Sequence, residues 1–122
     1  MATILLIEDD QQFVRLLEKV LPPHGHTVVH AATAMAGLRM SDQCCPELVL
    51  LDLDLPDLDG KVVATTLRAR PALRQVPIVA VSAHDQPTMQ RLVLAYGCNG
   101  FIPKPIDTRT FPDQIAAFLN RN

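Results

Sequence analysis

Carboxylates gather in two short segments of this 122-residue chain, and each segment directly follows a run of apolar residues. Glu8 and Asp9 follow the run at residues 3–7, and Asp52 follows the run at residues 48–51. Short apolar runs bounded by turn residues are typical of strands that are buried on both faces of a sheet. Open α/β sheets bind their ligands at the edge where the strands end. We therefore interpret these carboxylates as candidates for a site at that edge.

Two more polar residues follow later apolar runs and would reach the same edge. Ser82 follows the run at residues 77–81, and Lys104 follows a short fifth run. Parallel strands share one polarity, so the residues that follow them meet at one edge of the sheet. The first and third strands must be neighbours if Asp9 is to approach Asp52, as they are in the strand order 2-1-3-4-5.

The chemistry of this predicted set indicates a metal ion and a phosphoryl group. Glu8, Asp9 and Asp52 would repel one another by several kcal/mol per close pair at an effective dielectric constant of about 20. Mg²⁺ takes oxygen ligands, and with the Lys104 ammonium it would balance these negative charges. Such a site suits a phosphoryl group, with Asp52 as the nucleophile that forms an aspartyl phosphate. The alternative on these grounds alone is a set of solvated loop acids that bind nothing.

Five apolar segments alternate with amphipathic segments along the chain, which predicts five strands and five helices. Apolar residues at helical spacing mark the segments between the strands. The alternation is typical of an α/β fold with a doubly wound, flavodoxin-like parallel sheet, in one domain spanning residues 1–122. The strands are expected at residues 3–7, 26–30, 48–51, 77–81 and 99–102.

Local patterns make three finer predictions about the helices. Ala31 and Met35 belong to an apolar stripe that predicts the buried side of the second helix. Thr110 and Asp113 resemble a capping box at the start of the last helix. The arginines are mostly scattered, which indicates solvated helix faces.

The composition excludes several classes of protein. A net charge of −2 without a basic run predicts no binding to nucleic acid. No apolar run approaches the roughly 20 residues of a membrane helix and no signal peptide is recognisable, so we expect a cytoplasmic protein without a membrane partner. The three cysteines, of which Cys44 and Cys45 are adjacent, suit neither a disulfide framework nor a zinc site.

Four motifs in a fixed order give a specific family resemblance. They are ILLIEDD, LLDLDLPDLDG, VSA and GFIPKP, at residues 4–10, 50–60, 81–83 and 100–105. With these motifs the chain resembles a response-regulator receiver domain, the phosphoacceptor module of two-component signalling, over essentially all 122 residues. The receiver would be stand-alone or excised from a longer protein, with no output domain encoded in this chain.

The resemblance implies a role for each residue of the acidic site. Asp52 would take a phosphoryl group from a histidine kinase or a phosphotransfer protein. Glu8 and Asp9, with an oxygen of Asp52 and the backbone carbonyl of Asp54, would bind Mg²⁺. Lys104 would pair with Asp52 and later with the phosphoryl group.

The resemblance also implies how the domain would switch. The Ser82 hydroxyl would move to bond a phosphoryl oxygen, and Phe101 would swing into the space that Ser82 leaves. This would alter the surface formed by the fourth helix, fifth strand and fifth helix, which would control a downstream protein or a weak dimer of an otherwise monomeric chain. The peptide bond between Lys104 and Pro105 is expected to be cis, a geometry that is rare except before proline.

Three residues keep more than one interpretation. Asp54 and His84 come two residues after Asp52 and Ser82, at positions where the family tunes the lifetime of the phosphoryl group. The plainer interpretation is a solvated Asp54 side chain and an exposed loop histidine. Tyr96 stands where receivers usually carry a small residue, and it either contacts a partner or varies the packing.

Two other functions compete with a phosphorylation-controlled switch. A receiver can serve as an interaction module without being phosphorylated, although every expected chemical group is present here. The segment from Asp52 to Asp54 is also similar to the nucleophile motif of haloacid-dehalogenase phosphatases. That family carries the motif on its first core strand and in a longer chain. We therefore expect a phosphoacceptor that assists its own phosphorylation and dephosphorylation, not a turnover enzyme.

Overall fold

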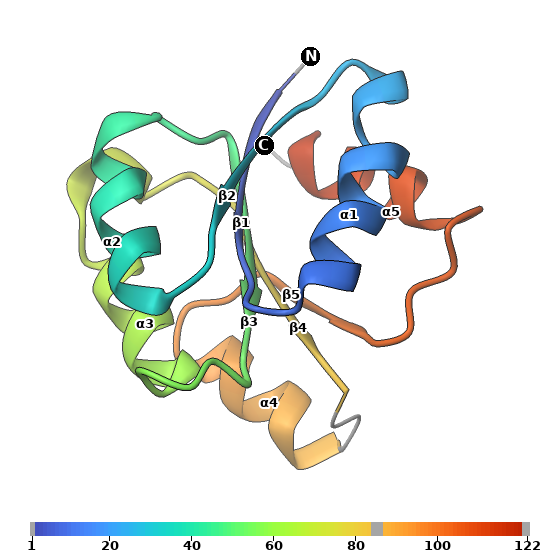
Figure 1. Ribbon diagram of the computed structural model, residues 1–122. Helices are drawn as coiled ribbons and strands as arrows, with labels where there is room; N and C mark the ends of the chain where they lie inside the picture. The colour runs from blue at the N-terminus through green and yellow to red at the C-terminus, as the bar shows by residue number, and fades with distance from the viewer. Residues whose placement is uncertain (1, 84–86, 121–122) are drawn as a thin grey trace.

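Five parallel strands form one sheet in the order β2-β1-β3-β4-β5, which confirms the predicted topology (Figure 1). The computed structural model describes residues 2–83 and 87–120. In the centre of the sheet Ile7 pairs with Leu51, so the carboxyl ends of the first and third strands are adjacent. The strands are β1 (Thr3–Ile7), β2 (Thr27–Ala31), β3 (Leu48–Asp52), β4 (Ile78–Ser82) and β5 (Gly100–Pro103).

Helices cover both faces of the sheet, so the α/β fold is doubly wound as predicted. Figure 1 shows α1 and α5 on one side of the strands and α2 and α3 on the other, with α4 at the lower edge of the view. None of the helices in the described residues has the length and apolar character needed to cross a membrane. The helices are α1 (Gln11–Val20), α2 (Ala34–Gln43), α3 (Gly60–Arg68), α4 (Pro87–Ala95) and α5 (Phe111–Leu119), with short 3₁₀ helices at Pro22–His24 and Pro71–Leu73.

The side chains of β3 alternate between two hydrophobic cores. Val49 and Leu51 pack in the core on the side of α2, α3 and α4, whereas Leu48 and Leu50 pack in the core on the side of α1 and α5. All four side chains are fully buried. This two-sided burial is the reason that the strand reads as a continuous apolar run. Asp52 is the last residue of the strand and is buried at its carboxyl end.

The predicted stripe of the second helix is wrong at Ala31 and Met35, whereas Ala34, which belongs to the same stripe, is buried as predicted. Ala31 is the last residue of β2, and α2 begins only at Ala34. Thr33 is the N-cap, because its hydroxyl oxygen accepts a hydrogen bond from the Ala36 N–H at 3.1 Å. Met35 is exposed to 53% of its surface, so the helix turns this side chain toward solvent.

The predicted capping box at the start of the last helix is also wrong. Thr110 has helical backbone angles and makes no capping hydrogen bond through its side chain. The carbonyl of Asp107 instead accepts from the backbone N–H groups of Thr110 and Phe111, at 3.1 and 2.9 Å. The Asp107 carbonyl therefore satisfies the Thr110 N–H, which the Asp113 side chain would have bonded in a capping box.

Arg68 departs from the prediction that the arginines lie on solvated helix faces. Its guanidinium donates to the carbonyls of Gly97 and Leu73, at 3.0 and 2.8 Å. It also donates to the side-chain oxygen of Asn99 at 2.7 Å. Burial lowers the pKa of this guanidinium from its ordinary value. Arg68 thus ties the end of α3 to the segments before β4 and β5.

Candidate functional site

Three carboxylates that are far apart in the sequence meet at the carboxyl edge of the sheet. One carboxylate oxygen each from Glu8, Asp9 and Asp52 lies within 4.8 Å of the others. Glu8 and Asp52 are buried, with 1% and 2% of their surface exposed, and Asp9 is exposed. Oxygen donors at this spacing, two of them sheltered and one open to solvent, suit a hard divalent cation.

Lys104 reaches this cluster from the loop after β5. Its Nζ lies 2.7 Å from Glu8 Oε1 and 3.8 Å from Asp52 Oδ1. The same ammonium lies 4.5 Å from the centroid of the Phe13 ring on α1, where the ring face attracts a cation. The sequence predicts a pair with Asp52, but the shorter contact of Lys104 is with Glu8. The ammonium therefore bridges two carboxylates and compensates part of their charge.

Hydrogen bonds that involve the backbone fix the positions of the two buried acids. The Asp10 N–H donates to Glu8 Oε2 at 3.1 Å, and the Asp54 N–H donates to Asp52 Oδ1 at 3.0 Å. His30 on β2 donates its Nε2–H to the Glu8 carbonyl at 2.8 Å. These bonds hold the carboxylates close together despite their mutual repulsion.

The surroundings of Asp52 raise the pKa of its carboxyl from 3.8 to about 7. Burial is the largest cause, and the adjoining Glu8 carboxylate adds to it by hydrogen bonding and by charge. The N–H of Asp54 and the ammonium of Lys104 act in the opposite direction. In the metal-free protein Asp52 is therefore a carboxyl that takes up a proton near neutral pH. A bound divalent cation would relieve the repulsion and favour the ionised form.

Ser82 lies at the end of β4 with its side chain fully buried. Its hydroxyl donates a hydrogen bond to Asp54 Oδ2 at 3.1 Å. Its carbonyl accepts from the Lys104 N–H at 2.9 Å, so the strand that carries Ser82 also positions the lysine. Asp54 is exposed, as the plainer interpretation predicts, and its carboxylate in addition accepts this hydrogen bond from Ser82.

Two further predicted positions follow β5. The Lys104–Pro105 peptide bond is cis, as the sequence predicts. Phe101 pairs with Ala80 of β4, and its half-buried ring packs against the core that includes residues of α2, α3 and α4. The predicted tuning residue His84 lies outside the described residues.

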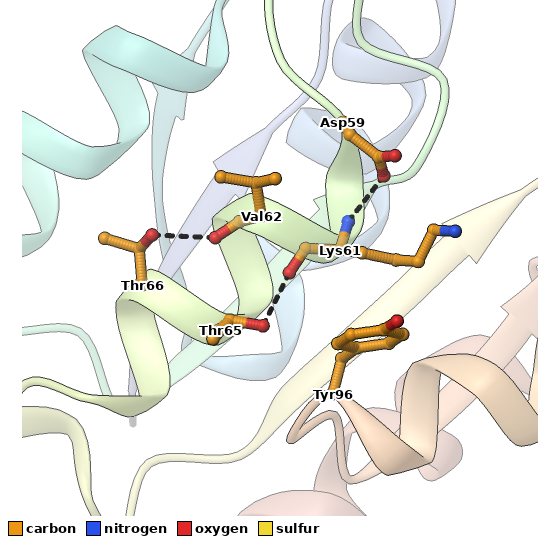
Figure 2. A pocket seen from close by; sticks show the side chains of 6 residues that line it. All are labelled: Asp59, Lys61, Val62, Thr65, Thr66 and Tyr96. Carbon is orange, nitrogen blue, oxygen red and sulfur yellow. Dashed lines mark hydrogen bonds between the residues drawn. The ribbon is translucent and has the colours of Figure 1, made fainter.

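Tyr96 follows α4 and faces α3 (Figure 2). The Lys61 ammonium lies 5.8 Å above the centroid of its ring. The tyrosine is 40% exposed and lines a hollow of about 350 Å³ with residues of α3. The contact with Lys61 gives the ring a place within the molecule, which fits the interpretation of Tyr96 as a packing variation. The residues of the hollow are Asp59, Lys61, Val62, Thr65, Thr66 and Tyr96.

Asp57 and Gly60 organise the loop after β3 in ways that the sequence analysis missed. The Asp57 carboxylate accepts from the backbone N–H of Ala34 at 3.0 Å and of Met35 at 3.1 Å, and these bonds lower its pKa. At Gly60 a Cβ would lie only 3.0 Å from the Cα of Leu53, so a larger residue would press on the backbone beside Asp52. The Pro, Asp and Gly residues of the loop predict a turn in which an Asp side chain bonds the nearby backbone. They do not predict that the Asp57 carboxylate bonds the start of α2.

Comparison with known proteins identifies the family. The chain matches the family model described as the response regulator receiver domain over residues 4–116, and it belongs to that family. A curated relative is the polar-differentiation response regulator DivK of Brucella ovis, 25% identical over 117 residues that cover 96% of this chain and 95% of the relative.

Solved structures of receiver domains share the fold. A CheY-like response regulator receiver domain protein from Methanospirillum hungatei is 26% identical, with a TM-score of 0.88 and coverage of 98% of this chain and 94% of that chain. The receiver domain of a sensor histidine kinase from Pseudomonas aeruginosa is 26% identical, with a TM-score of 0.89 and 98% coverage of both chains. That structure has a magnesium ion coordinated in its active site cleft.

Proposed function

We propose that this chain is a signalling switch in which Asp52 accepts a phosphoryl group from a phosphohistidine of a kinase or phosphotransfer protein. The observation that carries the proposal is the position of Asp52, a buried carboxyl beside Glu8, Asp9 and Lys104 at the end of the central strand. The chain would be a phosphoacceptor and not a turnover enzyme. Its net charge of −2 and the lack of a basic run in the sequence do not favour binding to nucleic acid.

The carboxylates of Glu8, Asp9 and Asp52, with the backbone carbonyl of Asp54, are the proposed ligands of Mg²⁺. When bound, Mg²⁺ would neutralise oxygens of the incoming phosphoryl group and favour the ionised form of Asp52. A carboxylate oxygen of Asp52 would then form a bond to phosphorus, while the bond from phosphorus to the donor imidazole nitrogen breaks and its electron pair stays on that nitrogen. Lys104, already between two carboxylates, would turn part of its charge to the phosphoryl oxygens.

The donor would approach beside α1. A hollow of about 310 Å³ opens there, next to Lys104, and its lining is mostly apolar and amphipathic. The hollow shares Lys104 with the carboxylate cluster, so a phosphohistidine carried by a protein that binds in it would lie beside Asp52. The residues that line it are Asp10, Gln12, Phe13, Leu16, Ala83, Lys104 and Pro105.

The output would pass through Ser82 and Phe101 to the surface of α4, β5 and α5. Ser82 and Phe101 lie on the paired strands β4 and β5, so a displacement at the end of β4 would also move β5. Leu92 and Leu94 on α4 are exposed, with 37% and 52% of their surface accessible, and offer apolar area to a downstream protein or to a second copy in a weak dimer.

The proposal predicts that acetyl phosphate and Mg²⁺ label the native protein and not the Asp52→Asn variant. Asn has the shape of Asp but no nucleophilic carboxylate, so labelling is expected to fall by at least about 100-fold. Asp113→Asn, which alters an exposed acid on α5, is a matched control and should label like the native protein. Label retained by Asp52→Asn contradicts the assignment. A native protein that takes no label but still binds a partner would instead be a phosphorylation-independent interaction module.

A further inference from the structure

The proton of the Ser82 hydroxyl is already engaged in this conformation. It is donated to Asp54 Oδ2 over 3.1 Å, from a side chain that is fully buried at the end of β4. A serine hydroxyl has a single proton to donate. While Ser82 bonds Asp54, that proton is not available to a phosphoryl oxygen on Asp52.

Asp54 is anchored next to the residue whose state it would sense. Its backbone N–H donates to Asp52 Oδ1 at 3.0 Å, while its carboxylate accepts a hydrogen bond from the Ser82 hydroxyl. Asp54 therefore contacts Asp52, the proposed phosphoacceptor, through its backbone N–H. It contacts Ser82, the proposed switch residue, through its carboxylate. A hydrogen bond to an ionised carboxylate is about twice as strong as one between neutral groups.

We propose that Asp54 is a positioning residue that holds Ser82 in the unphosphorylated arrangement, so that its carboxylate competes with the phosphoryl group for the serine proton. The proposal rests on the proposed function, because the competitor is a phosphoryl group on Asp52. The two arrangements are states of one equilibrium, and each acceptor favours its own state. Loss of the Asp54 carboxylate should therefore shift the equilibrium toward the phosphoryl-bound arrangement.

A simpler effect of Asp54 is general repulsion between its charge and the phosphoryl group. Asp54→Asn and Asp54→Ala separate the two effects. The Asn variant removes the charge but keeps an oxygen that can accept the Ser82 proton, whereas the Ala variant removes both. Repulsion alone predicts that the two variants bind a phosphoryl analogue with equal affinity. Competition for the proton predicts a further change on going from Asn to Ala, and it predicts that this change depends on Ser82.

The experiment titrates each protein with beryllofluoride, a phosphoryl analogue that binds an aspartate carboxylate, in the presence of Mg²⁺. Binding is followed by the backbone amide signals of Ser82 and Phe101, which also report that each variant is folded. We expect the dissociation constant of the analogue to fall about tenfold in Asp54→Ala, equivalent to about 1.4 kcal/mol. We expect a fall of only about threefold in Asp54→Asn, since a neutral acceptor is the weaker competitor.

The same two substitutions are then made in a Ser82→Ala background. Competition for the proton predicts that Asp54→Ala and Asp54→Asn agree within about twofold there, because no hydroxyl remains to be shared. Equal dissociation constants for the Asn and Ala variants in the presence of Ser82 would overturn the proposal and leave charge repulsion alone. Failure of the native protein to bind the analogue, or equal binding by Asp52→Asn, would refute the proposed function and this inference with it.

Discussion

Replacing Lys104 with Met is expected to lower the free energy of unfolding by about 3 kcal/mol in metal-free buffer, because two buried carboxylates then lose their shared cation. The Lys104 Nζ lies 2.7 Å from Glu8 Oε1 and 3.8 Å from Asp52 Oδ1, and both acids are almost fully buried. Removal of one partner from a buried ion pair costs more than the pair itself contributes, since the remaining charge stays unsolvated.

The size of this loss should depend on Mg²⁺. A divalent cation bound to the same carboxylates would compensate part of the missing charge, so the destabilisation should shrink when millimolar Mg²⁺ is added. Labelling by acetyl phosphate should nevertheless fall about 100-fold, as is typical when one preorganised donor to a transition state is removed. Urea unfolding at several Mg²⁺ concentrations measures the first effect, and initial labelling rates measure the second.

Lys61→Met is the matched control for Lys104→Met. Lys61 lies over the ring of Tyr96, 5.8 Å from its centroid, and an exposed cation–π contact contributes less than about 1 kcal/mol. The control should therefore lose little stability and label normally. Equal losses for the two lysine variants would show that Lys104 does not serve the carboxylate cluster.

Replacing Asp52 with Asn is expected to stabilise the metal-free protein by up to about 4 kcal/mol at about pH 8. The pKa of Asp52 rises from 3.8 to about 7 on folding, chiefly because of burial and then because of Glu8. A folded-state pKa above the unfolded value means that the folded protein holds the proton more tightly. The carboxyl is thus harmless to stability below about pH 4, and its cost grows until the pH passes about 7.

The gain from Asp52→Asn should consequently follow pH in a defined way. It should be largest above about pH 7 and should fade as the pH approaches 4, the window between the two pKa values. Mg²⁺ should stabilise the native protein more than the variant, because Asp52 is one of the proposed ligands. Thermal or urea unfolding across this pH range measures the difference. Asp113→Asn, a change at an exposed acid in the first turn of α5, should shift stability by less than about 1 kcal/mol at every pH. A gain for Asp52→Asn that does not vary with pH would contradict the proposed burial cost.

The sequence predicts the fold and the acidic cluster because both depend on short-range patterns. Apolar runs such as that of β3 specify strands buried on both faces, and the shared polarity of parallel strands brings their ends together. The requirement that Asp9 approach Asp52 then selects the strand order. Neither the strand order nor the meeting of the strand ends depends on the orientation of a particular side chain.

The contacts that the sequence analysis missed are those between side chains and distant loops. Asp57 bonds the start of α2, more than twenty residues away, and Arg68 bonds the segments before β4 and β5. Spacing along the chain does not predict such contacts, because an acid in a turn has the same local sequence pattern whether it is solvated or caps a distant helix. The bond between Ser82 and Asp54 belongs to the same class, and it changes Asp54 from a surface acid into a candidate part of the switch.

The most direct test of the central claim is to identify the residue that carries the phosphoryl group. Sodium borohydride reduces an acyl phosphate, so that a phosphorylated aspartate becomes homoserine, which peptide mass spectrometry can place in the sequence. After treatment with acetyl phosphate and Mg²⁺, homoserine is expected at position 52 and at no other acid of residues 50–60. Homoserine at Asp54, Asp57 or Asp59, or none in a protein that Mg²⁺ demonstrably binds, would contradict the claim that Asp52 is the phosphoacceptor.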